Sequence, residues 1–372
     1  MTRHDLDEHL ISQWRDMWSS QPRATPNAEP DRFLAVCKSL GVTPELLEIR
    51  DNQGRAGLIV GRRERIRITR RLGYLAIRLP PLESLVIVYG GVLGSASPDA
   101  VADRILTVLS DPTGVDHVVF NKLEHNSELF NTLLDLRYTI QHKIEPHWVI
   151  DLPDGYEALM SNHSSKHRSN LRRLDRRLFE GDSHIIFNEY CSPDSVLRFS
   201  AAARDLLSQT YQSGIGVGSL PPDLWTSVLA CESAKNRLFC FSLEDSSGML
   251  AFQAGAIYGK TYYCEGTSYL PSYASMRPGT VLLHRVLKRL GDLGVQVVDF
   301  GFGDAEYKQT YGTRSWTEAT LHVYGSGLRS KMCFMLDIFV LKSDWLCKRT
   351  MSPLLVQRIK RWWRNRLTPK GP

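Results

Sequence analysis

Apolar residues recur at helical spacing in several segments of the chain, and typical helix-start and helix-stop residues bound most of these segments. The predicted helices are Leu6–Ser19, Asp31–Leu40, Asp99–Leu109, Ser127–Leu136, Ser164–Glu180, Pro193–Gln212, Pro222–Lys235 and Gly279–Leu293. Short β-rich runs lie between the helices. They are Leu46–Arg50, Gly57–Arg62, Tyr74–Leu79, Leu85–Val92, Val115–Phe120, His147–Leu152, His184–Tyr190, Arg237–Leu243, Met249–Tyr258, Thr261–Gly266, Val295–Phe300 and Thr317–Tyr324.

The same order of elements, β-hairpins followed by a helix and a strand, occurs in both halves of the chain. This order predicts an α/β fold and suggests a tandem duplication of one α/β unit. We expect an N-terminal domain over residues 1–150, a C-terminal domain over residues 151–327 and a basic helical tail over residues 328–372.

The composition fits a globular protein of about two domains, with 372 residues, 42% apolar residues and a mean hydropathy of −0.24. The seven cysteines are scattered and form no Cys-x-x-Cys pair, which argues against a disulfide framework or a zinc site. The sequence shows neither a run of 18 apolar residues nor a secretory signal at its start. We therefore expect a cytoplasmic protein without a bound metal.

Positive charge is concentrated in two places. Leu328–Pro372 contains 11 Lys/Arg and 2 Asp/Glu, and Lys166–Arg177 contains six cations and one acid. The net charge of +6 thus combines +9 and +5 in these segments with −8 in the remainder. A body of this sign argues against nucleic-acid binding across a whole face. The two basic segments narrow the expected partners to a phosphorylated donor or acceptor and anionic lipid.

The first segment with candidate chemistry is His163–Arg177. Leu171, Leu174 and Leu178 fall in one narrow sector of the predicted helix, and the cations cover the rest. Those cations are Lys166, Arg168, Arg172, Arg173, Arg176 and Arg177. Such a density of cations suits a phosphate or an acidic glycan, and the alternative is a solvated charged face.

The second segment, Arg277-Pro278-Gly279-Thr280, opens a helix whose buried stripe is Leu283, Val286, Leu287 and Leu290. Free amides at a helix start, with Arg277 beside them, can hold a pyrophosphate. Gly279 would let a ligand approach the backbone closely. The alternative is an ordinary Pro-Gly turn.

The third segment is Asp299-Phe-Gly-Phe-Gly-Asp304-Ala-Glu306-Tyr307-Lys308, directly after an apolar strand. Glycine-rich loops at strand ends are common ligand sites in α/β folds. Asp299, Asp304 or Glu306 is a candidate base, Tyr307 a candidate proton donor and Lys308 a candidate anion contact. The alternative is a polar corner between a strand and a loop.

These three segments, in this order, resemble the CelD-like acyltransferase family of the GNAT superfamily. The resemblance rests on Ser164–Arg173 followed by Leu178–Gly181, on Tyr269 before Arg277-Pro278-Gly279, and on Asp299–Lys308. It covers roughly residues 155–325, and the N-terminal half is similar to the degenerate first domain of the same proteins. The family is related to the FemABX transferases, so the resemblance implies tandem GNAT-like domains with mixed, mostly antiparallel sheets.

The resemblance implies transfer of an acyl group from acyl-CoA to an amine or hydroxyl of a sugar, polysaccharide or cell-envelope precursor, in exopolysaccharide or cellulose biosynthesis. The implied catalytic residues are Asp299, Asp304, Tyr307 and Glu265, which stands where the family often has an aspartate. The implied acceptor contacts are Lys166, Arg168, Arg172 and Lys308. The implied acyl-CoA contacts are Arg277, Gly279, Thr280 and Val281.

The phosphate loop departs from the superfamily pattern. The usual pattern is Arg/Gln-x-x-Gly-x-Gly/Ala, and this chain has only Arg277-x-Gly279. Two alternatives therefore stay open. One is a FemABX-type aminoacyl transferase with a tRNA-borne donor, whose RNA would face Lys166–Arg177. The other is a non-catalytic adaptor of a polysaccharide-synthesis complex.

The tail contains the apolar run Met332–Leu341, interrupted by Asp337 and too short to span a bilayer. A further helix is predicted from Pro353 to Leu367, with Trp362 and Trp363 on its apolar side. Tryptophan beside Lys/Arg suits an anionic membrane surface, and the alternative is a helix docked on the protein. If the tail binds membranes, deletion of Leu328–Pro372 should release the protein from anionic liposomes.

Overall fold

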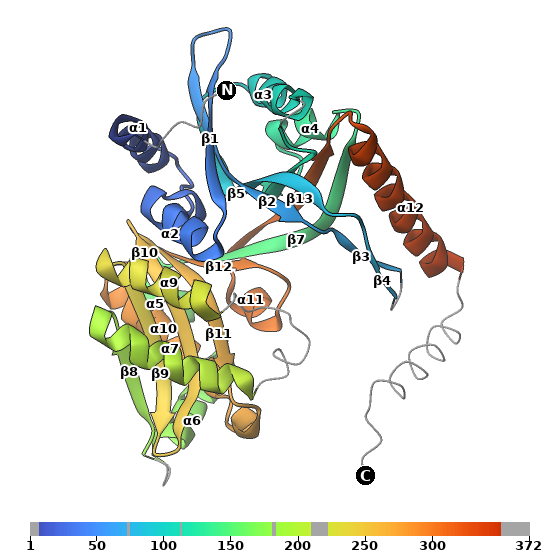
Figure 1. Ribbon diagram of the computed structural model, residues 1–372. Coiled ribbons are helices and arrows are strands. Elements are labelled where there is room, and N and C mark those ends of the chain that lie inside the picture. Colours follow the sequence, from blue (N-terminus) through green and yellow to red (C-terminus); the bar gives the residue numbers. More distant parts are fainter. Residues whose placement is uncertain (1–6, 73–74, 112–113, 181–183, 210–221, 351–372) are drawn as a thin grey trace. The chain divides into compact units, whose positions relative to one another are not determined.

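A computed structural model describes residues 7–72, 75–111, 114–180, 184–209 and 222–350 (Figure 1). The chain forms two compact units, each built from two segments. Unit 1 comprises Met1–Val42 and Ile144–Glu318, and unit 2 comprises Thr43–Lys143 and Ala319–Pro372. The units therefore do not follow the consecutive domains expected from the sequence, because the first helices pack with the later segment.

Unit 1 holds a sheet with the strand order β7-β12-β11-β10-β9-β8. Its strands are β7 (Thr139–Asp151, which begins in unit 2), β8 (Ile186–Tyr190), β9 (Leu238–Asp245), β10 (Gly248–Tyr258), β11 (Thr261–Tyr269) and β12 (Val297–Phe302). Its helices are α1 (Glu8–Ser19), α2 (Pro30–Leu40), α5 (Gly155–Ser161), α6 (Ser165–Phe179), α7 (Pro193–Ser208), α9 (Pro222–Ala234), α10 (Pro278–Asp292) and α11 (Glu306–Tyr311), with 3₁₀ turns η1 (Pro26–Ala28) and η2 (Pro271–Met276).

Helices cover both faces of this sheet. Side chains along β9 point alternately to one face and to the other, and those on each face pack against helices. Leu238 and Cys240 pack in one core with α7 and α9. Phe241 and Leu243 point the other way, into a core shared with α6 and α10. Leu174 and Leu178 of α6 and the stripe predicted for α10 lie in this second core, and Leu171 is also buried, which confirms the orientation expected for both helices.

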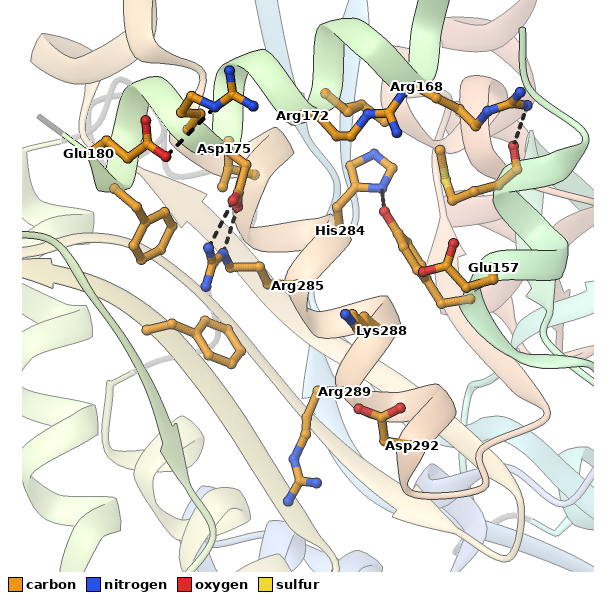
Figure 2. A pocket seen from close by; sticks show the side chains of 17 residues that line it. Glu157, Arg168, Arg172, Asp175, Glu180, His284, Arg285, Lys288, Arg289 and Asp292 are labelled. Carbon is orange, nitrogen blue, oxygen red and sulfur yellow. Dashed lines mark hydrogen bonds and ion pairs between the residues drawn. The ribbon is translucent and has the colours of Figure 1, made fainter. Parts of the chain in front are cut away.

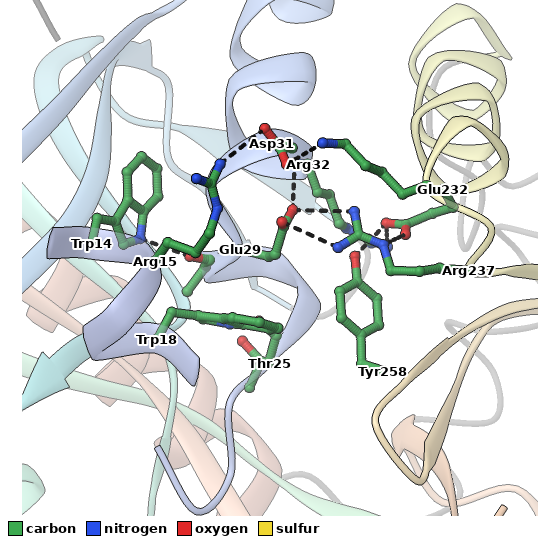
Figure 3. Close-up of polar contacts among 12 residues, drawn as sticks. Trp14, Arg15, Trp18, Thr25, Glu29, Asp31, Arg32, Glu232, Arg237 and Tyr258 are labelled. Carbon is green, nitrogen blue, oxygen red and sulfur yellow. Dashed lines mark hydrogen bonds and ion pairs between the residues drawn. The ribbon is translucent and has the colours of Figure 1, made fainter. Parts of the chain in front are cut away.

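The N-terminal segment belongs to unit 1 through buried aromatic and ionic contacts (Figure 3). Trp14 of α1 is fully buried against Phe33, and its indole N–H donates to the Ala28 carbonyl. Arg32 of α2 is buried and forms an ion pair of 3.2 Å with Glu232 of α9. A charged pair out of water needs this close geometry to offset its lost hydration.

Unit 2 holds the strand order β1-β2-β5-β6-β13 and a separate β3-β4 hairpin. Its elements are β1 (Thr43–Arg50), β2 (Ala56–Ile66), β3 (Thr69–Leu72), β4 (Leu75–Arg78), β5 (Leu82–Gly94), α3 (Pro98–Ser110), β6 (His117–Glu124), α4 (Glu128–Leu134), β13 (Arg314–Tyr324, which begins in unit 1) and α12 (Leu328–Thr350). Helices α3 and α4 pack on the sheet through a core that includes Ile105 and Phe130.

Both units contain the same β-α-β arrangement. In unit 2, β5 and β6 are parallel and joined by α3. In unit 1, β11 and β12 are parallel and joined by α10. Each first strand of these pairs has an irregular, antiparallel partner on its other side, β2 or β10. The repeat agrees with the expected duplication, and the α/β fold with mixed sheets flanked by helices is confirmed.

The C-terminal tail begins with α12, a helix of 23 residues that runs well beyond the predicted apolar run. Within the described ranges, we find no helix that combines the length and the apolar character needed to cross a bilayer. The predicted helix Pro353–Leu367 lies outside the described residues.

Candidate functional site

Strands β11 and β12 pair over a short distance only. The parallel pairing joins Thr261–Tyr263 to Val297–Asp299, after which both strands continue without pairing to each other. A bulge interrupts each strand at this level: Glu265 is the extra residue on β11, and Phe300 is the extra residue on β12. Bulges bend strands and are frequent beside functional sites. We call the space between the unpaired ends of these two strands the β11–β12 opening.

Asp299, a predicted catalytic residue, is the last residue of β12 that pairs with β11, and its carboxylate accepts hydrogen bonds from two donors. Oδ1 accepts from Nε2 of buried His147 on β7 at 2.7 Å and from the N–H of Gly301 at 2.7 Å. His147 Nδ1 faces Glu318 Oε2 at 3.5 Å, and Trp316 stacks on the imidazole. This arrangement favours a role for Asp299 in fixing the strand end.

His147 was not predicted as a site residue. Burial alone would lower its pKa, but its contacts with Asp299 and Glu318 outweigh burial and raise the pKa to about 9. The residue is therefore an imidazolium at neutral pH, placed between two carboxylates. A lone histidine in a predicted strand, 152 residues before its partner, carries no signal in the sequence.

Glu265, the bulged residue of β11, is paired with a cation from the N-terminal segment. Its Oε1 lies 2.7 Å from Nη1 of Arg32, and the same nitrogen contacts Glu232. Beside it on β11, burial raises the pKa of the Cys264 thiol to about 12, so this thiol is a neutral group. The structure thus places Glu265 at the opening, and the guanidinium of Arg32 balances its charge.

The loop after β12 carries the other predicted catalytic residues. Burial raises the pKa of Tyr307, so its hydroxyl keeps its proton and can donate it. Asp304 is exposed, accepts a hydrogen bond from the Gln309 side chain, and has no cationic partner in the described ranges. Lys308 is buried, and its Nζ donates to the carbonyls of Phe300, Gly301 and Phe302.

These bonds change the expected role of Lys308. A contact with the acceptor was predicted. Instead, the ammonium donates to carbonyls of β12 beyond Asp299, where β11 no longer pairs with this strand. Burial lowers the pKa of Lys308. The three carbonyls use all three ammonium protons, so the side chain supports the shape of the opening.

The start of α10 holds the residues predicted to contact acyl-CoA. Arg277 has left-handed backbone angles, with φ +51°, and its side chain is exposed. The N–H groups of Thr280 and Val281 both donate to the Arg277 carbonyl, and Pro278 has no N–H. Among these residues, the N–H of Gly279 is therefore the donor that this turn offers to a ligand. Val281 is buried, and its side chain lies in the core.

A pocket of about 860 Å³ lies between α5, α6 and α10 (Figure 2). Arg168 and Arg172 of α6 line this pocket. Their predicted role in binding an acidic group requires such a position. Arg168 donates to carbonyls at the end of α5, including that of His163 at 2.5 Å, whereas Arg172 has no ion pair or hydrogen bond within the described part of the chain. Lys166 is exposed but does not line the pocket.

Histidines and tyrosines gather where α6, α10 and α11 meet, and sequence reasoning missed this cluster. His167 Nε2 lies 3.2 Å from the Tyr311 hydroxyl, and His163 stacks on His167. His284 packs edge-on against Tyr311, and its Nδ1 lies 3.1 Å from the Tyr156 hydroxyl. Burial lowers the pKa of His284 to about 4, so this imidazole is neutral.

The described residues contain no group of three or more His, Cys, Asp or Glu side chains arranged to hold a metal ion. Asp299 instead bonds to His147, and Glu265 contacts Arg32.

Residues 165–309 match a family model described as an acetyltransferase (GNAT) domain. The match contains α6, the start of α10, the β11–β12 opening and the loop to Lys308. A comparison with curated proteins found no significant match. This match agrees with the GNAT part of the resemblance over residues 165–309.

Solved structures of similar fold span nearly the whole chain. The structure of FemX is 10% identical, with a TM-score of 0.59, and the match covers 88% of this chain and 98% of FemX. The C-terminal domain of a putative lysylphosphatidylglycerol synthetase from Agrobacterium fabrum is 11% identical, with a TM-score of 0.51. This match covers 89% of this chain and 96% of that domain. A protein of unknown function from Bacteroides thetaiotaomicron is 9% identical, with a TM-score of 0.52 and coverage of 84% and 96%. At these identities the likeness shows the fold.

Proposed function

We propose that this protein is an acyltransferase of the CelD-like branch. It would use acyl-CoA and acylate an amine or hydroxyl of a sugar, polysaccharide or cell-envelope precursor, in exopolysaccharide or cellulose biosynthesis. The observation that carries the proposal is the β11–β12 opening next to the start of α10, inside the segment that matches the acetyltransferase domain.

The start of α10 supports the position of the donor. In unit 2, the equivalent helix α3 is capped by its own Ser97, whose Oγ accepts from the Ala100 N–H. At α10 the cap residue is Arg277, and within the described residues no side chain caps this helix. An uncapped helix start with a cation beside it attracts phosphate groups. The donor pyrophosphate would lie at Arg277 and Gly279, with Thr280 and Val281 shaping the turn.

Transfer requires a proton to leave the acceptor and another to reach the thiolate of CoA. Tyr307 keeps its proton because it is buried, and we assign it the second step. Asp304 is exposed and free of cationic partners among the described residues, so we assign it the first step. Asp299 and Glu265 would act by holding the two strand ends apart, through His147 and Arg32.

The acceptor would bring an acidic group to the pocket beside α6. Arg172 lines this pocket without a partner in the described ranges, and Arg168 lies one turn before it. An unpaired guanidinium group such as that of Arg172 suits phosphate, as in a nucleotide- or lipid-linked sugar. Lys166, exposed at the start of α6, would extend this positive surface toward a longer acceptor.

Isothermal titration with acetyl-CoA, longer acyl-CoAs and aminoacyl-tRNA tests the proposal. We expect binding of a CoA thioester that weakens about tenfold in Arg277→Ala, because one charge-assisted phosphate contact is lost. The matched control is Arg173→Ala, an exposed arginine bonded to Asn170, which should bind like the unaltered protein. Absence of binding to every CoA ester would overturn the proposal.

A second candidate is an aminoacyl transferase with a tRNA-borne donor. The observations that favour it are the likeness to FemX and the exposed cations Arg173 and Arg177 of α6, which do not line the pocket. Binding of charged tRNA without binding of CoA esters would support it. Absence of binding to either donor would favour the adaptor of a polysaccharide-synthesis complex.

A further inference from the structure

Helix α12 is attached to unit 2 through apolar contacts and through buried polar residues. Cys333 lies in a core of unit 2, and Phe334, Ile338 and Leu341 pack against that core. Asp337 is fully buried and accepts hydrogen bonds from Arg70 of β3 at 2.8 Å and from the Tyr324 hydroxyl at 2.6 Å. One face of the helix also buries Ser330, whose hydroxyl donates to the Asp116 carbonyl, and Val340. A buried carboxylate with this many partners fixes which side of the helix faces the sheet.

The opposite side of α12 is apolar and exposed. Six side chains on it are between 42% and 79% exposed: Leu328, Met332, Met335, Leu336, Phe339 and Leu346. At about 100° per residue they fall within roughly 120° of the helix circumference, and the centre of that sector lies opposite Asp337. We call these six residues the outer stripe.

The outer stripe departs from the usual pattern of a surface helix, which exposes a polar face, because α12 has apolar side chains on its exposed side as well as on its buried side. A contiguous exposed apolar surface of this kind marks a contact with a partner or a membrane. The fixed orientation of Asp337 prevents the helix from rotating to bury the stripe against its own unit.

We infer that α12 lies flat on an anionic membrane surface, with the outer stripe inserted among the lipid chains. Charge supports this occupant: exposed Lys342 borders the stripe, and Lys331 lies on the same edge. The 22 residues that follow Thr350 add six Lys/Arg and no Asp/Glu, together with Trp362 and Trp363. Cations beside apolar and tryptophan side chains are characteristic of helices at anionic interfaces.

The same charge argues against a second copy of the chain as the occupant. Pairing two outer stripes would bring together two segments, each with 11 Lys/Arg and 2 Asp/Glu. Like charges at that density repel unless salt screens them. The helix is also not one that can cross a bilayer, so the contact would be peripheral.

Co-sedimentation of the full chain with vesicles tests the inference. One set is phosphatidylcholine alone, and the other contains about one third phosphatidylglycerol. We expect binding to the anionic set, with a partition coefficient at least about tenfold lower for Met335→Gln/Phe339→Gln. The control Ile186→Gln/Leu197→Gln removes two equally exposed apolar side chains outside α12 and should bind like the unaltered protein.

A second variant, Lys342→Glu, separates charge from apolar contact and should also weaken anionic binding. Unchanged thermal unfolding of all variants will show that the fold is intact, since every substituted side chain is exposed. Equal binding of the Met335/Phe339 variant and the unaltered protein would overturn the inference. So would equal binding to both vesicle sets, or a dimer in light scattering that the Met335/Phe339 variant abolishes without any binding to vesicles.

Discussion

His147 Nε2 donates to Asp299 Oδ1 at 2.7 Å and thereby joins the side chain of a β7 residue to the last residue of β12 that pairs with β11. The bond joins residues 152 positions apart. It holds the carboxylate at the level where β11 and β12 stop pairing. The same imidazole faces Glu318, so one cation balances two acidic groups beside the β11–β12 opening.

The first prediction concerns the pH dependence of stability. The pKa of His147 is about 9 in the folded protein, against about 6.5 for an unfolded chain. Because the folded state holds this proton more tightly, its stabilisation is complete below about pH 6.5 and is lost as the pH rises through about 9. The difference corresponds to roughly 3 kcal/mol.

Urea unfolding at pH 6, 7.5 and 9.5 measures this effect. The unaltered protein should lose stability over that range, and His147→Gln should lose much less, since glutamine does not titrate. His125→Gln is the control, because no carboxylate partner of His125 occurs in the described ranges. Parallel curves for the unaltered protein and His147→Gln would contradict the prediction.

The sequence predicted the elements around the site better than the contacts within it. The leucines of α6 and the stripe of α10 follow helical spacing, a local property, and they are buried as predicted. The partners of Asp299 and Glu265 come from β7 and α2, far away in the sequence. No spacing rule reveals such pairs, because the fold alone brings them together.

Lys308 and Phe339 show a second limit of sequence reasoning. A lysine after an acidic loop is expected to contact a ligand, yet the ammonium of Lys308 donates to carbonyls of β12. Phe339 lies in an apolar run that suggests a buried helix, yet it is exposed because Asp337 takes the buried side. In both residues the tertiary position decides the role, and amino-acid type alone does not.

The second prediction concerns Arg32, which joins the N-terminal segment to the opening. Arg32→Met leaves Glu232 and Glu265 without their shared cation, and Glu232 is fully buried. Loss of one partner from a buried ion pair costs about 3–5 kcal/mol. Chemical unfolding of Arg32→Met measures the loss. Adding Glu265→Gln should restore part of it, and a double variant as unstable as Arg32→Met would show that Glu265 is not strained by the missing charge.

The third prediction concerns the support of β12 by Lys308. Lys308→Met removes the donor of three carbonyls while keeping a similar shape, and we expect a loss of about 2–4 kcal/mol of unfolding free energy. Lys288→Met, on an exposed site of α10, should change stability by less than about 0.5 kcal/mol. Calorimetry of both variants checks the contrast, and equal melting temperatures would show that the ammonium does not support the strand.

The most direct test of the proposed donor site is hydrogen exchange with and without saturating acyl-CoA. The account predicts slower exchange in residues 264–269, 278–283 and 299–303, which surround the β11–β12 opening and the start of α10. Unit 2 supplies an internal control, because residues 88–94 and 98–103 occupy the equivalent places around β5 and α3. Protection confined to the unit 1 segments supports the account, whereas protection in unit 2 instead, or in neither unit, would contradict it.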